Sequence, residues 1–83
     1  MNPVDLNYRR IILEQLAKVA PGAPVDRLED DENIREALDI DSFDSLNFLI
    51  ALHEKTGVDI KEKDYGKLNT IQEILDYLVV RAY

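Results

Sequence analysis

The residues of this chain best suited to covalent chemistry are two serines that each follow an aspartate, Ser42 and Ser45. A serine hydroxyl becomes a strong nucleophile only when a neighbouring base takes its proton. His53 is the one histidine, and it lies about three helical turns beyond Ser42, so the two side chains should not meet. The chain has no cysteine, which excludes a thiolate nucleophile and a disulfide. We therefore expect that the chain is not an enzyme.

The net charge of the chain indicates which kind of partner it can bind. A formal net charge of −7 disfavours binding to nucleic acid and to anionic membranes, and it favours basic protein surfaces. No apolar run is long enough to span a membrane, and charges interrupt the first apolar segment, so we expect a cytoplasmic protein without membrane insertion. The acidic run at 29–32 predicts a solvated loop and no metal site, because four consecutive acids cannot all converge on one ion.

The hydrophobic pattern predicts an all-α fold in one domain, residues 1–83. Apolar residues recur at helical spacing, and no alternating strand pattern is found. Thr70 and Glu73 form a capping box for the last helix. We expect a small bundle of three longer helices at about 4–20, 42–56 and 70–82, with one short helix at about 62–67.

A long first loop, residues 21–41, separates the first two helices. We expect it to be ordered, to cross between helices that run in similar directions, and to contain a helical turn at 33–38. The helix that follows should begin after Asp41 as its N-cap and end at Gly57. Five apolar side chains should pin the loop to the core: Val25, Leu28, Ile34, Leu38 and Ile40.

The helix at 42–56 has more apolar surface than one core face needs. At about 100° per residue, Ser45 falls on the presumed core face with Phe48, Leu49 and Leu52. Three further apolar residues, Phe43, Leu46 and Ile50, fall outside that face. Two interpretations stay open: a central helix covered on two sides, or an exposed apolar patch available to a partner.

The same geometry separates the two serines. Ser42 occupies the first helical position, where unpaired backbone N–H groups and the helix dipole favour an attached phosphate. Ser45 is one turn further along, and we expect it to be buried with its hydroxyl bonded back to a carbonyl. Taken alone, Ser42 is also compatible with a plain helix-start serine.

Three segments resemble the acyl carrier protein family, and together they cover most of the chain. They are "LDIDSFDSLNFLIAL" at 38–52, "ALHEKTGVDI" at 51–60 and "LNTIQEILDYL" at 68–78. The family's Asp-Ser-Leu/Met motif is spelled more closely at Asp44-Ser45. However, the distance to the matching Ala51-Leu52 is the family's usual one only from Ser42. We therefore align the family's attachment serine with Ser42.

The resemblance implies that Ser42 bears a 4′-phosphopantetheine arm, which a phosphopantetheinyl transferase takes from coenzyme A using magnesium. The arm would carry an acyl, aminoacyl or peptidyl group as a thioester and present it to acyl-loading and acyl-processing enzymes. Asp41 would cap the helix and assist recognition by the transferase. The expected partner-binding residues are Phe43, Asp44, Leu46, Ile50, Glu54 and Ile60. Ile60 would line a groove with Tyr65 and Leu68, although ordinary core packing is an equal alternative for all three.

Several positions depart from the family pattern. Asp39 stands where glycine is usual, and Asn47 and His53 stand where the carriers of fatty acid synthesis often have acids. The resemblance therefore implies a carrier of a specialised biosynthetic pathway, acting as a monomer. The alternative is a helical interaction module that carries nothing and binds a partner through the patch of Phe43, Leu46 and Ile50.

Overall fold

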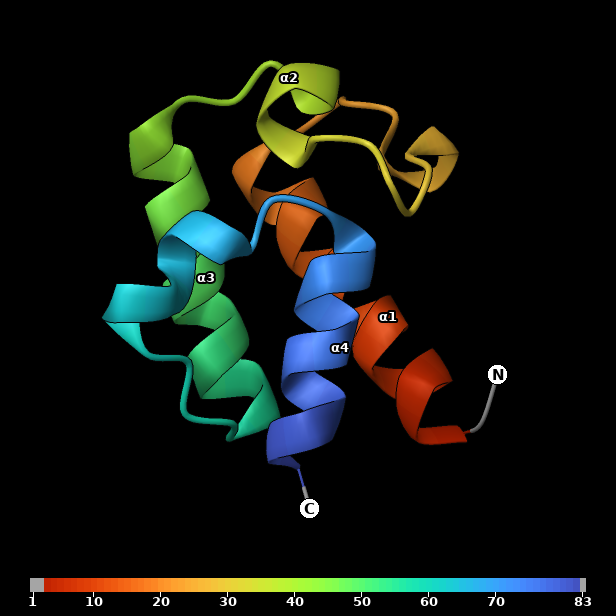
Figure 1. Cartoon of the computed structure of the whole chain (residues 1–83). Coiled ribbons are helices and arrows are strands. Elements are labelled where there is room, and N and C mark those ends of the chain that lie inside the picture. Colours follow the sequence, from red (N-terminus) through yellow and green to blue (C-terminus); the bar gives the residue numbers. More distant parts are fainter. Residues whose placement is uncertain (1–2, 83) are drawn as a thin grey trace.

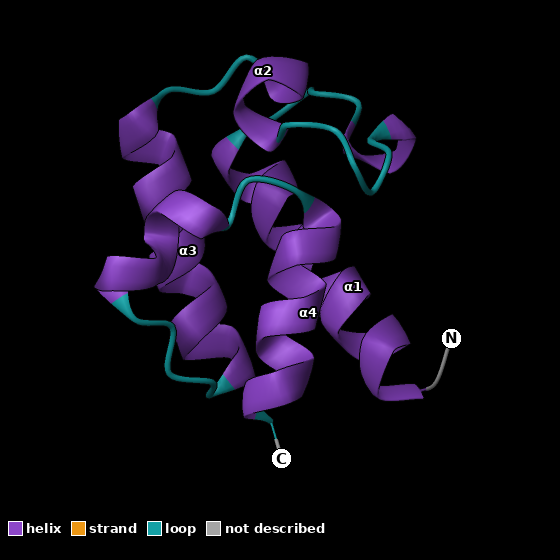
Figure 2. Ribbon diagram, viewed as in Figure 1, coloured by secondary structure: helices purple, strands orange, loops and turns teal. Residues whose placement is uncertain are grey.

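The computed structural model describes residues 3–82, and all of its regular structure is helical (Figures 1 and 2). The three longer helices and the short one expected from the sequence are present, and a brief 3-10 turn was not expected. The elements in chain order are α1 (Pro3–Val19), η1 (Val25–Arg27), α2 (Ile34–Leu38), α3 (Ser42–Thr56), η2 (Glu62–Lys67) and α4 (Ile71–Arg81). None of the helices within 3–82 is long and apolar enough to cross a membrane.

The helix ends follow from local hydrogen bonds that the sequence predicted. Asp41 caps α3, since its Oδ1 accepts a hydrogen bond of 2.8 Å from the N–H of Asp44. Gly57 ends α3 in the left-handed conformation, at φ 72°. At α4, Thr70 accepts from the N–H of Glu73, but the Glu73 carboxylate accepts from Asn69 N–H, one residue before the expected partner.

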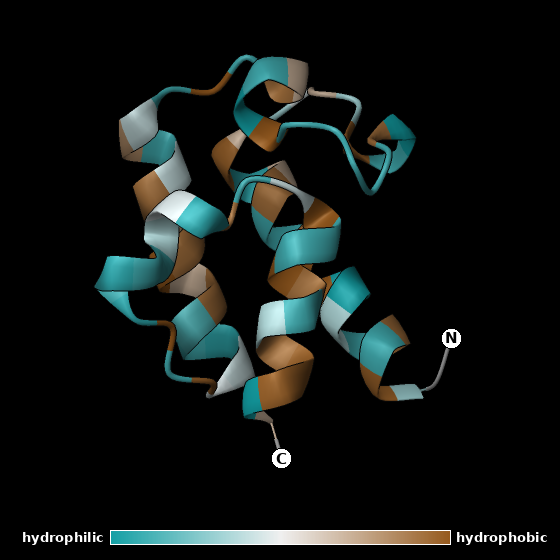
Figure 3. Ribbon diagram, in the orientation of Figure 1, coloured by the Kyte–Doolittle hydropathy of each residue, from teal (hydrophilic) through white to brown (hydrophobic). Residues whose placement is uncertain are grey.

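The core lies where α1 packs against α3 and α4. Apolar bands alternate with polar ones along these helices (Figure 3), because only one face of each meets the others. The side chains with the least exposure come from all three helices: Ile12, Leu16, Phe48, Leu52, Ile71, Ile74 and Leu78. The cluster extends into the loop at 21–41, where Leu28, Ile34, Leu38 and Ile40 are buried and Val25 is half-buried, as expected.

The direction expected for α3 was wrong. In Figure 1, α1 rises from the N-terminus while α3 and α4 both descend, so the loop at 21–41 joins antiparallel helices. Its length serves to cover one end of the bundle with η1 and α2. Backbone hydrogen bonds tie that cover to α4: Ile34 N–H donates to Asn69 O at 2.8 Å, and Gln72 N–H donates to Asp30 O at 3.1 Å.

Candidate functional site

Ser42 is the first residue of α3, and its side chain is exposed. Asp41 precedes it with extended backbone angles, and the Asp41 carbonyl accepts the N–H of Ser45 at 3.0 Å. The N–H groups of Ser42 and Phe43 have no hydrogen-bond partner among residues 3–82. They point out of the start of a 15-residue helix, a position that favours a negatively charged group.

The turn before Ser42 depends on an unusual backbone conformation. Asp39 closes α2 in the left-handed region, at φ 52° and ψ 47°, and its N–H donates to the carbonyl of Arg35. It is the only non-glycine residue with positive φ in the described part of the chain. Glycine adopts this conformation without a penalty, whereas aspartate is one of the few other residues that tolerate it.

Ser45 is not buried as we expected. It is half-buried, and its hydroxyl makes no hydrogen bond to another described residue. Both serines line one open hollow of about 280 Å³ between α2, α3 and η2. The other residues around it are Arg35, Leu46, Leu49, Tyr65, Gly66 and Asn69. Its polar groups are the hydroxyls of Ser42 and Ser45, the phenol of Tyr65, the amide of Asn69 and the guanidinium of Arg35. Leu46 and Leu49 supply its apolar part.

The second apolar face of α3 is exposed. Phe43 is 68%, Leu46 39% and Ile50 42% exposed, whereas the core face of the same helix is buried through Phe48 and its neighbours. The interpretation of a helix covered on two sides is therefore wrong. Figure 3 shows apolar and polar bands alternating along α3. On the same helix Asp44 is half-buried and Glu54 is exposed.

Ile60 does not belong to this surface. Its side chain is only 4% exposed and packs in the core, as does that of Leu68. The expectation that Ile60 contacts partners is therefore corrected: the segment after α3 turns it inward, and a partner cannot reach it in this structure. Tyr65 is half-buried and lines the hollow beside Ser42, so of the three groove residues only Tyr65 is placed there.

His53 makes a structural hydrogen bond within the fold. Its Nδ1 accepts a hydrogen bond of 3.1 Å from the N–H of Ile60, which holds the segment after α3 against the helix. Ser42 and His53 lie at opposite ends of α3, so the structure contains no Ser-His pair. Within residues 3–82 no group of three or more His, Asp or Glu side chains converges on a metal position. In the acidic loop, Asp30 forms an ion pair with Arg9 of α1.

A polar cluster that sequence reasoning missed joins η2 to α4. We call it the Asp64 cluster: Asp64, Tyr77 and Arg81, with the N–H of Lys61. Tyr77 donates its hydroxyl to Asp64 Oδ2 at 2.8 Å and accepts the N–H of Lys61 at 3.0 Å. The hydrogen bond from Tyr77 lowers the pKa of Asp64, and burial raises the pKa of Tyr77. Arg81 stacks 3.5 Å from the centre of the Tyr77 ring. The cluster fixes η2, which carries Tyr65 and Gly66 of the hollow.

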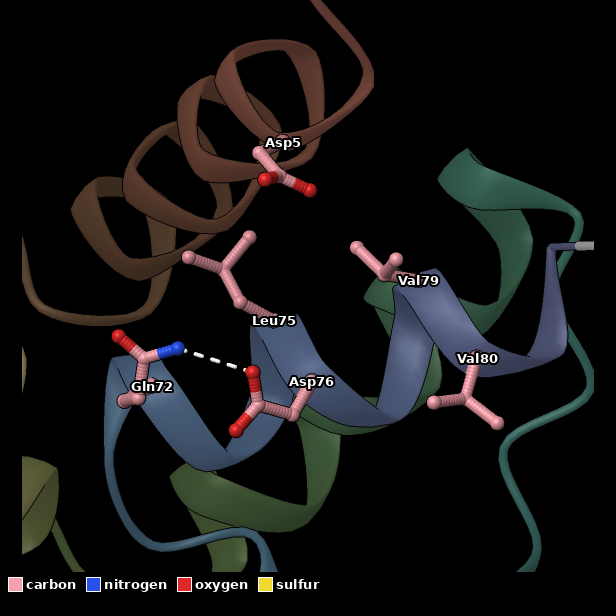
Figure 4. A pocket seen from close by; sticks show the side chains of 6 residues that line it. All are labelled: Asp5, Gln72, Leu75, Asp76, Val79 and Val80. Atoms are coloured by element: carbon pink, nitrogen blue, oxygen red, sulfur yellow. Dashed lines mark hydrogen bonds between the residues drawn. The ribbon is translucent and has the colours of Figure 1, made fainter. Parts of the chain in front are cut away.

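A second hollow, of about 260 Å³, opens between α1 and α4 (Figure 4). Asp5 of α1 points toward Leu75 and Val79 of α4, while Gln72 donates a 2.9 Å hydrogen bond to Asp76. No hydroxyl or thiol side chain lines this hollow, and it shares no residue with the hollow beside Ser42. Of the two hollows, the one beside Ser42 is therefore the better candidate for covalent attachment, through the Ser42 hydroxyl.

Comparisons with known proteins identify the family of the chain. Residues 10–78 match the family described as "Phosphopantetheine attachment site". The chain is 33% identical over 75 residues to an acyl carrier protein of Thermosynechococcus vestitus, covering 88% of this chain and 93% of that protein. Among solved structures, an acyl carrier protein from Enterococcus faecalis superposes with a TM-score of 0.67 at 28% identity, covering 88% and 96% of the two chains.

Proposed function

The chain belongs to the acyl carrier protein family, whose cofactor is 4′-phosphopantetheine, and we propose that Ser42 is its attachment residue. It is a carrier and not an enzyme. The observation that carries the proposal is the exposed Ser42 hydroxyl at the start of α3, beside two unpaired N–H groups and an open hollow. The rival, Ser45, is half-buried one turn further along.

The residues at this end of α3 fit a phosphodiester. On attachment, the Ser42 oxygen bonds to the pantetheine-side phosphorus of coenzyme A, the pyrophosphate bond breaks, and 3′,5′-ADP leaves. The transferase, with magnesium, removes the hydroxyl proton, since the one histidine of this chain lies toward the other end of α3 and accepts the N–H of Ile60. Asp41 holds the helix start in place and is the acid we expect the transferase to recognise. The arm supplies the thiol for thioesters that this cysteine-free chain lacks.

Intact mass tests the attachment residue. The purified chain is incubated with coenzyme A, magnesium and a promiscuous phosphopantetheinyl transferase. We expect one phosphopantetheine on the wild-type chain and on Ser45→Ala, and none on Ser42→Ala. Addition that survives Ser42→Ala but not Ser45→Ala would move the site to Ser45. No addition to the wild-type chain would favour the non-carrier interaction module instead.

We assign partner binding to Phe43, Leu46 and Ile50, with Asp44 and Glu54 meeting basic residues of the partner. These three residues share one exposed face of α3, neighbouring exposed apolar side chains often mark a protein-interaction site, and Phe43 stands directly beside Ser42. The test is kcat/KM for phosphopantetheinylation of Phe43→Ser, which we expect to fall roughly tenfold. The matched control is Val80→Ser, since Val80 is also about 70% exposed but lies on α4. An equal effect of both changes would refute the assignment.

We propose that the carrier serves a specialised pathway as a cytoplasmic monomer of one domain, residues 1–83. The support is the weak acidity of α3 on its later turns, where Asn47, His53 and Lys55 stand. Enzymes of fatty acid synthesis that bind acidic carriers should therefore use it poorly. A malonyl transferase of fatty acid synthesis should load the holo chain at least about tenfold more slowly than its own carrier. Equal rates would contradict the proposal.

A further inference from the structure

Arg35 is a cation without a partner at the edge of the hollow beside Ser42. It lies on α2 and is exposed, and its guanidinium makes no ion pair or hydrogen bond with the described residues. It also lines a neighbouring hollow with Asp39 and Asn69. Arg35 and Asn69 are the residues common to both hollows, so they stand between them.

The surroundings of Ser42 are otherwise acidic. Asp39, Asp41 and Asp44 lie within three positions of Ser42, and the chain carries a net charge of −7. A phosphodiester on Ser42 adds a further negative charge to this region. Arg35 is the one cation that lines the hollow with Ser42. Its planar fork of donors matches the geometry of two phosphate oxygens.

We propose that Arg35 binds the phosphodiester on Ser42 and so directs the pantetheine arm into the hollow between α2, α3 and η2. This rests on the proposed function. The hollow suits the arm, whose two amides and hydroxyl need polar partners and whose dimethyl group needs apolar contact. Ser45, Tyr65 and Asn69 offer the polar groups, and Asn69 uses its amide N–H on Gly66 O, which leaves the amide oxygen to accept. Leu46 and Leu49 supply the apolar floor.

The experiment compares four holo proteins: wild type, Arg35→Gln, Arg35→Lys and Arg27→Gln. Arg27 is the matched control, since it is also exposed and forms no ion pair with the described residues, but it lines a hollow without Ser42. Intact mass first establishes that each chain carries the arm with a free thiol and no cargo. The readouts are the ³¹P transverse relaxation rate and the change in backbone amide shifts from apo to holo protein.

In the wild type and Arg27→Gln, we expect amide shift changes at Tyr65, Gly66 and Asn69. In Arg35→Gln these changes should disappear and the ³¹P relaxation rate should fall at least twofold, because the phosphodiester then moves independently of the fold. Arg35→Lys should restore part of both effects, since lysine keeps the charge but loses the fork.

Equal relaxation rates and equal shift changes in wild type and Arg35→Gln would overturn the inference. So would an effect of Arg35→Gln that appears only after the thiol carries a carboxylate-bearing cargo, because Arg35 would then bind the cargo. Either result leaves the attachment to Ser42 intact. Failure of the attachment itself is a separate result, visible as the absence of added mass on the wild-type chain.

Discussion

Replacing Tyr77 with phenylalanine removes one hydroxyl from the Asp64 cluster and leaves the ring against Arg81. In the wild type this hydroxyl donates to Asp64, whose side chain is 7% exposed, and accepts from the exposed segment at Lys61. Water can replace the hydroxyl at Lys61 N–H, but it reaches the buried carboxylate poorly. Loss of the hydrogen bond from Tyr77 to Asp64 is therefore expected to cost more than loss of the one from Lys61 N–H.

The magnitude follows from the type of hydrogen bond. A bond to a charged acceptor contributes about 1.5–3 kcal/mol net. Lys67 and Arg81 remain at 3.5 and 3.6 Å from the carboxylate and offset part of the loss. We expect Tyr77→Phe to lower the free energy of unfolding by about 2 kcal/mol, which lowers Tm by roughly 10 °C in a domain of this size.

Urea unfolding at several pH values tests the mechanism as well as the magnitude. The pKa of Asp64 is lowered in the fold, so its contribution is present above the ordinary carboxyl pKa near 4 and is lost as the pH falls through the folded value. The difference between wild type and Tyr77→Phe should thus be constant from about pH 7 to 5 and shrink below about pH 4.

The control is Tyr8→Phe, since Tyr8 is also half-buried but its hydroxyl makes no hydrogen bond with the described residues. It should change the free energy of unfolding by less than about 0.5 kcal/mol. The reasoning is refuted if Tyr77→Phe is equally mild at pH 7. It is also refuted if the loss does not begin to shrink as the pH falls below about 4, because each Asp64 that becomes protonated no longer offers a charged acceptor.

Three further changes test the end of the bundle that carries Ser42. Asp39→Gly should stabilise the fold by about 0.5 kcal/mol. Glycine removes the steric cost of the left-handed conformation, and this gain exceeds the cost of glycine's greater entropy in the unfolded chain. Urea unfolding that shows destabilisation would contradict this. Asp39→Ala should instead cost about 1 kcal/mol in the same assay, because alanine has no polar side chain to stabilise that conformation. Asp41→Ala removes the N-cap and should cost about 1 kcal/mol, and an unchanged thermal midpoint would argue against the cap.

The helices and their ends were accessible from the sequence because their causes are local. Asp41 caps α3 with a residue three positions away, and Gly57 ends it within one turn. The short η2 helix was also placed correctly at 62–67, although no side chain caps its start. Helix periodicity also separated the buried Phe48 from the exposed Phe43, because both faces of one helix follow from its 3.6-residue repeat.

Features made by residues far apart in sequence were missed or misplaced. The antiparallel course of α1 and α3 depends on how the loop at 21–41 folds over the bundle end, which its length does not reveal. Ile60 was expected at a groove and is buried, because His53 draws the segment back against α3. Ser45 was expected in the core, yet η2 leaves a hollow above it.

The sequence by itself therefore determined an all-helical fold with a serine at the start of α3, since caps and periodicity are local properties, and its motifs indicated a carrier through their resemblance to a family. Only the tertiary structure decided what surrounds that serine. Arg35 of α2, and Tyr65 and Asn69 of the segment around η2, line one hollow with Ser42. The Asp64 cluster holds one of those segments through contacts 13 and 16 residues apart. Such contacts depend on packing of the whole core, which no short stretch of sequence encodes.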